Sequence, residues 1–156
     1  MRYTAFIFLL LIPAMCHAQQ KALTFQQAEK QGIAMQKLDK LYANALDADT
    51  AKAVFKGAEV QVFYKAYTTM LSDLSIFLQK NNFKWEKPTR IFHRIYFEPD
   101  GNIDHYLLNL QPTSMDAAKQ DTLIKQVNEF AKNYKLAITA NKKFAQCSPA
   151  IYQDAK

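Results

Sequence analysis

The stretch IFHRIYFEPDGNIDHYLLNL, residues 91–110, constrains the fold more than any other part of the chain. Runs rich in aromatic and aliphatic residues lie on both sides of a Pro-Asp-Gly sequence, which is typical of two antiparallel strands joined by a short turn. Pro99 and Asp100 suit a type I turn, with Gly101 in the left-handed bulge position that follows it. The register expected from this turn pairs Glu98 with Asn102, Phe97 with Ile103, Ile95 with His105 and His93 with Leu107.

This register predicts that His93 and His105 lie on one face of the hairpin as diagonal neighbours, roughly 7 to 8 Å apart at the backbone. Together with the thiol of Cys147, two such imidazoles are candidate ligands for a metal ion. No further cysteine or carboxylate is placed to complete four ligands, and the spacing fits no known metal motif. The alternative interpretation is two partly buried histidines that hydrogen-bond to backbone or hydroxyl groups.

The two faces of the hairpin are expected to differ in polarity. The face with the histidines is the more apolar, and we expect helices to cover it. The opposite face is expected to be rich in arginine and tyrosine, which are enriched at protein interfaces. It is therefore a candidate recognition surface, and a solvated sheet face without a partner is the alternative. The covered face is expected to carry Ile91, Ile95, Phe97, Ile103 and Leu107, and the recognition surface Arg90, Arg94, Tyr96 and Tyr106, with Arg94 opposite Tyr106 in a cation–π contact.

Helical periodicity precedes the hairpin. Thr24 and Gln27 have the spacing of a capping box, ahead of an expected helix at 33–46. A longer apolar stripe predicts a second helix at 51–80, capped by Asp49 or Thr50. Because the connection between them is short, the two helices are expected to form an antiparallel helical hairpin.

The hairpin is followed by one more helix and one more strand. Ser114 or Asp121 is expected to cap a helix whose apolar positions extend from Leu123 to Tyr134. The sequence of residues 142–153 predicts a final strand. Pro149 indicates that this strand lies at an edge of the sheet or is interrupted. The order α-α-β-β-α-β predicts a single α+β domain over residues 19–156, with a three-stranded sheet that is at least partly antiparallel.

The first eighteen residues, MRYTAFIFLLLIPAMCHA, have the three parts of a secretory signal peptide. Arg2 supplies the positive charge, an apolar run follows, and Ala18 ends a small-x-small cleavage site. The apolar run is about half the roughly 20 residues of a membrane-spanning helix, so no transmembrane segment is expected after cleavage. The sequence therefore predicts an exported, periplasmic or secreted protein, and a lipoprotein anchored through Cys16 is the alternative.

Several chemistries have no counterpart in the sequence. With 3 glycines there is no glycine-rich phosphate loop, and neither a nucleophile elbow nor a zinc-protease motif occurs. The formal net charge is +6, but the lysines are scattered, so no basic stripe for nucleic acid is present. We expect no enzymatic activity, no cofactor and no nucleic-acid partner.

Residues 89–153 resemble the periplasmic C-terminal domain of TonB-type energy transducers. The resemblance lies in a strand, the turn sequence DGNI, a second strand, a helix and a final strand. The chain has no proline-rich spacer of the kind found in that family, and its N-terminal half has no counterpart there. More broadly, the whole chain is similar to small exported proteins of Gram-negative bacteria.

The sequence thus predicts an exported envelope protein that works as a non-enzymatic binding module, through a face or an edge of its sheet. The partner is expected to be an envelope protein or a small ligand. The alternative function is a small-ligand or metal carrier that uses His93 and His105, with Cys147.

Overall fold

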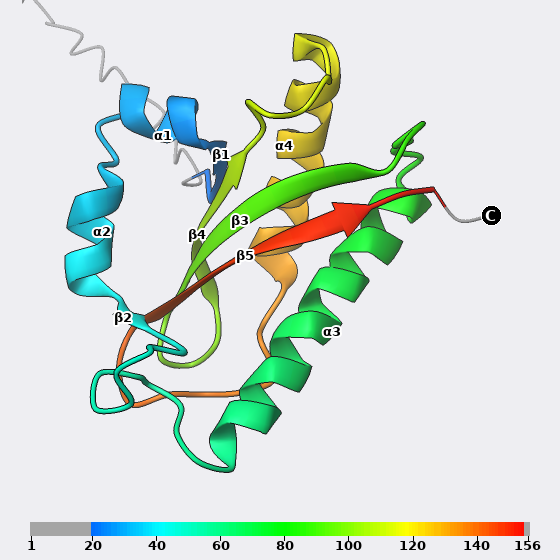
Figure 1. The fold of residues 1–156 in the computed structure, drawn as a ribbon. Coiled ribbons are helices and arrows are strands. Elements are labelled where there is room, and N and C mark those ends of the chain that lie inside the picture. Colours follow the sequence, from blue (N-terminus) through cyan, green and yellow to red (C-terminus); the bar gives the residue numbers. More distant parts are fainter. Residues whose placement is uncertain (1–19, 155–156) are drawn as a thin grey trace, which may run out of the picture.

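A computed structural model describes residues 20–154 of the chain (Figure 1). The signal peptide predicted at residues 1–18 and the alternative anchor Cys16 lie outside the described residues. The described part has an α+β fold, as predicted, but its sheet has five strands and not three. The elements are β1 (Ala22–Thr24), α1 (Phe25–Lys30), α2 (Met35–Leu41), β2 (Ala43–Asn44), α3 (Glu59–Lys80), β3 (Thr89–Phe97), β4 (Ile103–Asn109), α4 (Ala117–Asn133) and β5 (Phe144–Tyr152).

The sheet is mixed, with the strand order β1-β4-β3-β5-β2. The three long strands are antiparallel, since β3 pairs with β4 on one side and with β5 on the other. The short strands β1 and β2 add to the two sides in parallel. The sequence missed them because strands of three and two residues are too short to show alternation.

Helices cover the two faces of the sheet unequally (Figure 1). The long helices α3 and α4 pack on one face, called here the inner face, and enclose the main core. The short helices α1 and α2 pack on part of the other, called here the outer face, over a smaller cluster. That cluster comprises Leu23, Ala28, Leu38, Tyr42, Tyr96, Leu107 and Ala145.

The N-terminal half departs most from the sequence prediction. The capping box is confirmed, because the Gln27 amide donates to Thr24 Oγ1 (3.0 Å) and the Thr24 amide donates to Gln27 Oε1 (2.9 Å). The expected helix at 33–46 is shorter, since α2 ends at Leu41 and the chain then becomes extended and forms β2. The predicted antiparallel helical hairpin is wrong, because α2 and α3 pack on opposite faces of the sheet.

The expected helix at 51–80 begins later than predicted. Gly57 has a φ of +55°, so the helix starts only at Glu59, and the predicted caps Asp49 and Thr50 lie in a loop. The predicted end is confirmed, since Asn82 has a φ of +60° just beyond the last turn. Most of the apolar stripe predicted for α3 is buried, at Phe63, Ala66, Tyr67, Met70, Leu74 and Leu78, but Val62, which the sequence also placed in it, is exposed.

The hairpin turn forms as the sequence predicts. The Gly101 amide donates to the Glu98 carbonyl (2.9 Å), and the Glu98 amide donates to the Asn102 carbonyl (2.8 Å). Gly101 has a φ of +90°. Its carbonyl also accepts a hydrogen bond from the Leu136 amide (2.9 Å), which fixes the segment after α4 to the turn. A Cβ atom at this position would lie 2.6 Å from the carbonyl oxygen of Leu136, which no side chain can accommodate without backbone movement.

Gly101→Ala is therefore expected to lower the free energy of unfolding by more than about 2 kcal/mol, from left-handed strain and the backbone clash together. Gly57→Ala is the matched control: its φ is also positive, at +55°, but nothing lies within 4 Å of the added atom. It should cost only about 1 kcal/mol. Urea denaturation of the two variants measures the difference, and equal losses would contradict the clash.

Beyond the turn, the predicted register is wrong by one residue. Phe97 pairs with Ile103 as expected, but Tyr96 pairs with His105, so Asp104 is the extra residue of a β-bulge. From there on, each residue of β4 pairs with the β3 residue that follows its predicted partner, so His105 pairs with Tyr96 and not with Ile95. Leu107 consequently moves to the outer face, whereas Ile91, Ile95, Phe97 and Ile103 lie in the inner-face core as expected.

The last helix and strand are close to the prediction. The cap of α4 is Asp116, whose carboxylate accepts from the Lys119 amide (2.8 Å), and not Ser114 or Asp121. β5 pairs with β3 over its full length, from Phe144 to Tyr152, and Pro149 does not break it. β2 pairs only with Phe144 and Ala145, so among the described residues the rest of β5 is an edge, which confirms the predicted edge position of the proline. Across the part of the chain that the structure describes, no helix is both long and apolar enough to cross a membrane.

Candidate functional site: a groove on the outer face of the sheet

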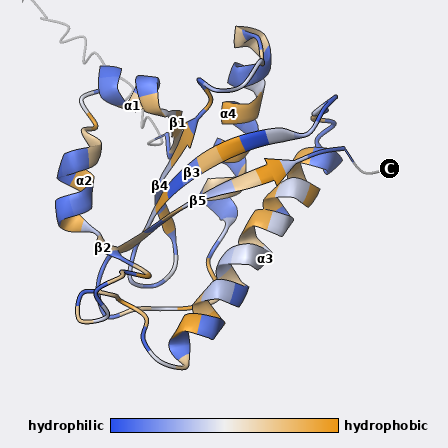
Figure 2. Ribbon diagram, in the orientation of Figure 1, coloured by the Kyte–Doolittle hydropathy of each residue, from blue (hydrophilic) through white to orange (hydrophobic). Residues whose placement is uncertain are grey.

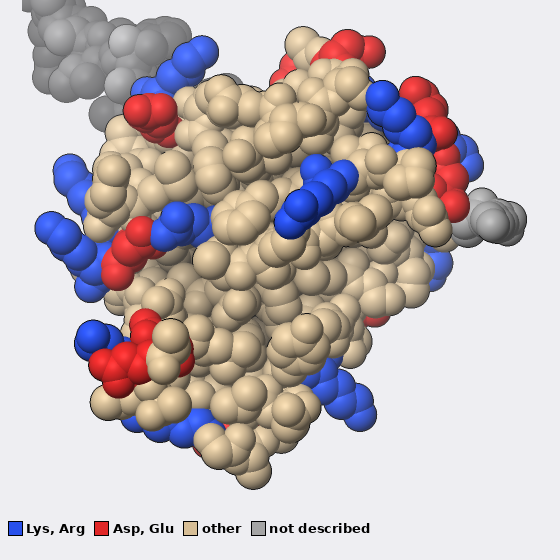
Figure 3. Space-filling view, viewed as in Figure 1, with Lys and Arg blue, Asp and Glu red and all other residues tan. Residues whose placement is uncertain are grey.

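Helices α1 and α2 leave a large part of the outer face uncovered, over β3 and β5 (Figure 1). Along β3, bands of hydrophilic residues interrupt the hydrophobic ones (Figure 2). In the uncovered part, Phe92 is 36 % exposed and Ile151 is 70 % exposed. The space-filling view from this side shows a broad area without acidic side chains and with a basic group near its centre (Figure 3).

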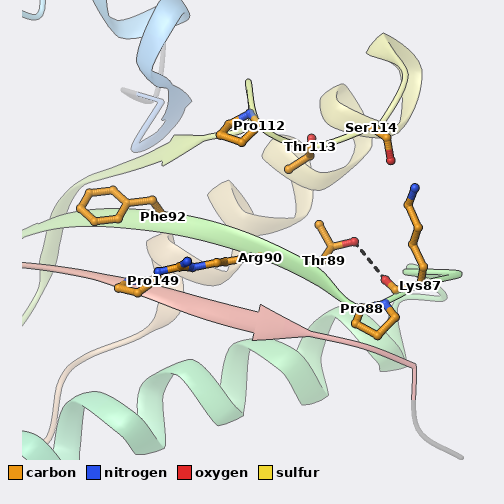
Figure 4. Close-up of a pocket in the computed structure, with 9 residues that line it drawn as sticks. All are labelled: Lys87, Pro88, Thr89, Arg90, Phe92, Pro112, Thr113, Ser114 and Pro149. Carbon is orange, nitrogen blue, oxygen red and sulfur yellow. Dashed lines mark hydrogen bonds between the residues drawn. The ribbon is translucent and has the colours of Figure 1, made fainter.

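A groove with a volume of about 620 Å³ lies in this area. Its floor is the beginning of β3, and one wall is the loop between β4 and α4 (Figure 4). The side chain of Lys87 points toward Ser114 at one end, while that of Arg90 extends along the sheet toward Pro149 (Figure 4). The groove is lined by Lys87, Pro88, Thr89, Arg90, Phe92, Pro112, Thr113, Ser114 and Pro149.

The groove exists because β4 ends before it reaches the beginning of its antiparallel neighbour β3. The last pair of the β3–β4 ladder is Phe92 with Asn109, whereas β5 pairs with β3 as far as Thr89. Beyond Asn109 a turn carries the chain away from the sheet, since both the amide (3.0 Å) and the hydroxyl (2.7 Å) of Thr113 donate to the Leu110 carbonyl. The first residues of β3 are therefore paired on one side only, and we call this gap in the sheet the notch.

The backbone of Arg90 faces the notch. The Tyr106 amide donates to the Lys21 carbonyl (2.8 Å), so the main-chain groups of Tyr106 point toward β1 and not toward β3. Tyr106 and its partner Ile95 are consequently a pair without mutual hydrogen bonds, and the main chain of Ile95 faces β5. Because the direction alternates along a strand, the N–H and C=O of Arg94, Phe92 and Arg90 all point toward the β4 side. At Arg90, β4 has already ended.

The charges of the groove are of one sign. Neither Lys87 nor Arg90 forms a salt bridge with any residue in the range 20–154, and no aspartate or glutamate lines the groove. Some other cations of the fold are paired, as Arg94 is with Asp39 and Lys143 with Glu98 (2.6 Å). The groove thus presents two uncompensated positive charges beside the exposed ring of Phe92.

Asp154 fixes the backbone just before Lys87, at one end of the groove. Its carboxylate accepts from the backbone amides of Trp85 (2.9 Å) and Glu86 (3.0 Å). These two bonds hold the pKa of Asp154 below its usual value, so the carboxylate is charged at neutral pH. Glu86, whose φ is +64°, also forms a salt bridge with Lys119 of α4 (2.8 Å).

The structure places the four residues predicted for the recognition surface in different surroundings. Arg90 is exposed on the outer face and lines the groove. Arg94 shares this face but is bound to Asp39 of α2, and Tyr96 is buried beneath α2, where its hydroxyl donates to Asp39 (3.1 Å). Tyr106 was placed on the wrong face: the bulge turns it into the inner core, where it is fully buried, so the predicted cation–π contact with Arg94 does not form.

The same bulge separates the proposed metal ligands. His93 is on the inner face, where its Nδ1 and the Tyr106 hydroxyl are 3.0 Å apart, and burial lowers its pKa to about 3. His105 lies on the outer face opposite Tyr96, and Cys147 is exposed opposite Arg94. The prediction that the two histidines are neighbours is therefore wrong, and residues 20–154 contain no group of three His, Cys, Asp or Glu side chains that could hold a metal ion.

A second polar cluster surrounds the bulge. The hydroxyl of Tyr42 donates to the carboxylate of Asp104, and Lys143 Nζ lies 3.8 Å from that carboxylate. Burial and this bond to Asp104 raise the pKa of Tyr42 far above its usual value, so the phenol keeps its proton. The cluster ties α2 to the sheet.

Comparison of the chain with protein-family models, with curated proteins and with solved structures finds no match. The resemblance of residues 89–153 to the TonB-type domain therefore stays a prediction. What is known of the site comes from its own geometry: an open groove with two free cations, one exposed aromatic ring and a strand that is paired on one side.

Proposed function

We propose that the protein is an exported, non-enzymatic binding module of the bacterial envelope, and that the groove on the outer face is its binding site. The observation that carries the proposal is the pair of uncompensated cations, Lys87 and Arg90, in a groove on an uncovered sheet face. Free basic groups beside exposed aromatic area are typical of recognition surfaces. Export rests on the leader sequence of residues 1–18.

The edge of β5 is a weaker site for a partner strand. The Ala45 amide donates to the Ala145 carbonyl (2.8 Å), so Ala145 and, by alternation, Cys147, Pro149 and Ile151 direct their backbone groups away from β3. Because proline has no N–H, the middle of this edge lacks a donor. A face with an open groove therefore supports binding better than this edge does.

The metal or small-ligand carrier loses its geometric support. Its three ligands, His93, His105 and Cys147, lie on two faces of the sheet. The neutral, buried imidazole of His93 is bonded to Tyr106 and sits in the core, so it is better explained as part of the fold.

Site-specific photo-crosslinking in intact cells tests the proposed function. A photoreactive benzoylphenylalanine in place of Ile151, on the outer face, should form a discrete adduct with a partner. The same group in place of Val62, which is 55 % exposed on α3, is the matched control and should form none. Arg90→Glu should remove the Ile151 adduct without changing the amount of folded protein. Equal adducts from both positions, or an adduct unaffected by Arg90→Glu, would refute the groove as the binding site.

A further inference from the structure

Two independent features of Arg90 converge on the notch. Its guanidinium is free of any carboxylate among the described residues and lies along the groove (Figure 4). Its backbone N–H and C=O point into the gap that β4 leaves, where no described strand pairs with them. A single residue thus offers a positive side chain and a main-chain donor and acceptor to the same occupant.

The main-chain features indicate an extended peptide. An N–H and a C=O on one residue of a strand are satisfied together when the directly opposite residue of an antiparallel strand returns both bonds. Phe92 and Asn109 already have this relation one step earlier in the ladder. A peptide in the notch would continue the ladder in the direction of β4, and it would replace water on backbone groups that the fold leaves unpaired.

The side-chain features indicate that this peptide is acidic. Residues directly opposite each other in an antiparallel pair have their side chains on the same face, about 5.5 Å apart at the backbone. The residue opposite Arg90 therefore extends over the outer face, beside the guanidinium and toward the end of the groove that holds Lys87. A carboxylate there meets two cations and no competing anion.

We propose that the notch binds an extended segment of a partner protein, with an Asp or Glu directly opposite Arg90. The main chain of that residue exchanges two hydrogen bonds with Arg90, and its carboxylate is bound by the guanidinium and by Lys87. This inference rests on the proposed function and specifies the chemistry of the partner. A phosphate or an acidic glycan would engage the two cations but would leave the main-chain groups of Arg90 unpaired.

Peptide titration of the purified protein, followed by the NMR signals of its backbone amides, tests the inference. The probe is acetyl-Glu-Thr-Val-Thr-amide, which has no charged ends and directs Glu and Val to one face. It starts with the residue opposite Arg90, because Asn109 already occupies the position opposite Phe92. We expect saturable shifts at Arg90, Phe92 and Thr113. Dissociation constants should rise at least tenfold when Gln replaces Glu in the peptide, and also when the nitrogen of that Glu is methylated.

Matched protein variants complete the design. Arg90→Glu should abolish the shifts, whereas Lys65→Glu makes the same charge change at an exposed position of α3 and should leave them intact. If the Gln or the N-methyl peptide binds as well as the probe, or if inorganic phosphate competes at equal concentration, the inference is wrong. If the peptide does not bind but the Ile151 adduct still forms, only the inference of an acidic segment is wrong. If neither the peptide binds nor the adduct forms, the proposed function is wrong as well.

Discussion

Phe144→Ala is expected to lower the free energy of unfolding by about 4 kcal/mol, a large part of the total stability of a domain of this size. The ring of Phe144 lies at the first position of β5, with 0 % of the residue exposed. Its centroid is 5.0 Å from that of Phe97 in β3, 5.2 Å from that of Phe55 in the loop before α3, and 6.2 Å from that of Phe63 in α3. One side chain therefore joins the sheet, the helix and the loop, and its loss leaves a cavity at their junction.

Phe92→Ala is the control for this prediction, since it removes the same ring from the outer face. Phe92 is 36 % exposed and has one aromatic neighbour, Phe25, at 6.4 Å. The loss should stay below about 1 kcal/mol, because an exposed ring leaves no cavity. Urea denaturation gives both values. Similar losses for the two variants would mean that the core is not organised around Phe144.

Acidification from pH 7 to pH 4 is expected to cost about 3 kcal/mol of stability through His93 alone. Burial lowers the pKa of His93 from 6.5 to about 3 in the folded protein, whereas in the unfolded chain the imidazole regains its ordinary value. Below pH 6.5 the unfolded state consequently binds a proton that the folded state does not. Stability is complete above that pH, falls as the pH decreases, and levels off near pH 3.

The surroundings of His93 offer no compensating charge. Tyr106 and Tyr152 flank its ring, with centroids 5.6 and 5.5 Å away, and the helices that cover it contribute leucine and valine side chains. Its Nε2 has no hydrogen-bond partner within residues 20–154. A proton on this ring would therefore be buried without an anion, which explains the direction of the shift.

His93→Asn separates this effect from the titration of carboxylates. The amide can still bond to the Tyr106 hydroxyl, but it cannot be protonated in this range. Aspartates such as Asp100 and Asp154, whose pKa values are lowered by hydrogen bonds, contribute equally to both proteins. The variant should lose markedly less stability than the parent between pH 7 and pH 4, as measured by urea denaturation at each pH. Parallel curves would show that His93 is not the group responsible.

The hairpin shows how far the sequence can be interpreted. Its turn was predictable, because Pro99, Asp100 and Gly101 each have a conformational preference that fits one turn type. The bulge at Asp104 was not, since a bulge adds one residue to one strand, and the apolar residues of both strands are compatible with two registers. This single residue decided the faces of His105, Tyr106 and Leu107, and with them the predicted metal site and the place of Tyr106 in the predicted recognition surface.

The helices show a similar limit. Periodicity identified the buried side of α3 correctly, but it cannot tell which face of a sheet that side meets. The segment after Gly32 was predicted as one helix because its apolar positions fit a helical stripe. In the fold, Tyr42 leaves that stripe to pack on Tyr96, with ring centroids 5.0 Å apart, and a two-residue strand follows. Tertiary contacts outweigh local propensity here.

The groove could be anticipated only in part. Arg90 was named from its residue type and place in β3, but Lys87, Thr113 and Ser114 come from segments with no common pattern. The one signal of the notch is Pro112, because a proline shortly after a run of strand-forming residues indicates where a ladder stops. The length difference between β3 and β4 that creates the gap follows from the turn at Leu110.

The bonds from Asp154 to Trp85 and Glu86 have a practical consequence for handling the protein. They connect the C-terminal end of the described chain to the turn that positions Lys87, so this terminus is part of the groove's support. Removal of residues from Asp154 onward by a carboxypeptidase would release two backbone amides at the mouth of the groove and leave the core untouched. Such a shortened protein would remain folded while losing a fixed position for one of its two groove cations, and an affinity tag is better attached elsewhere.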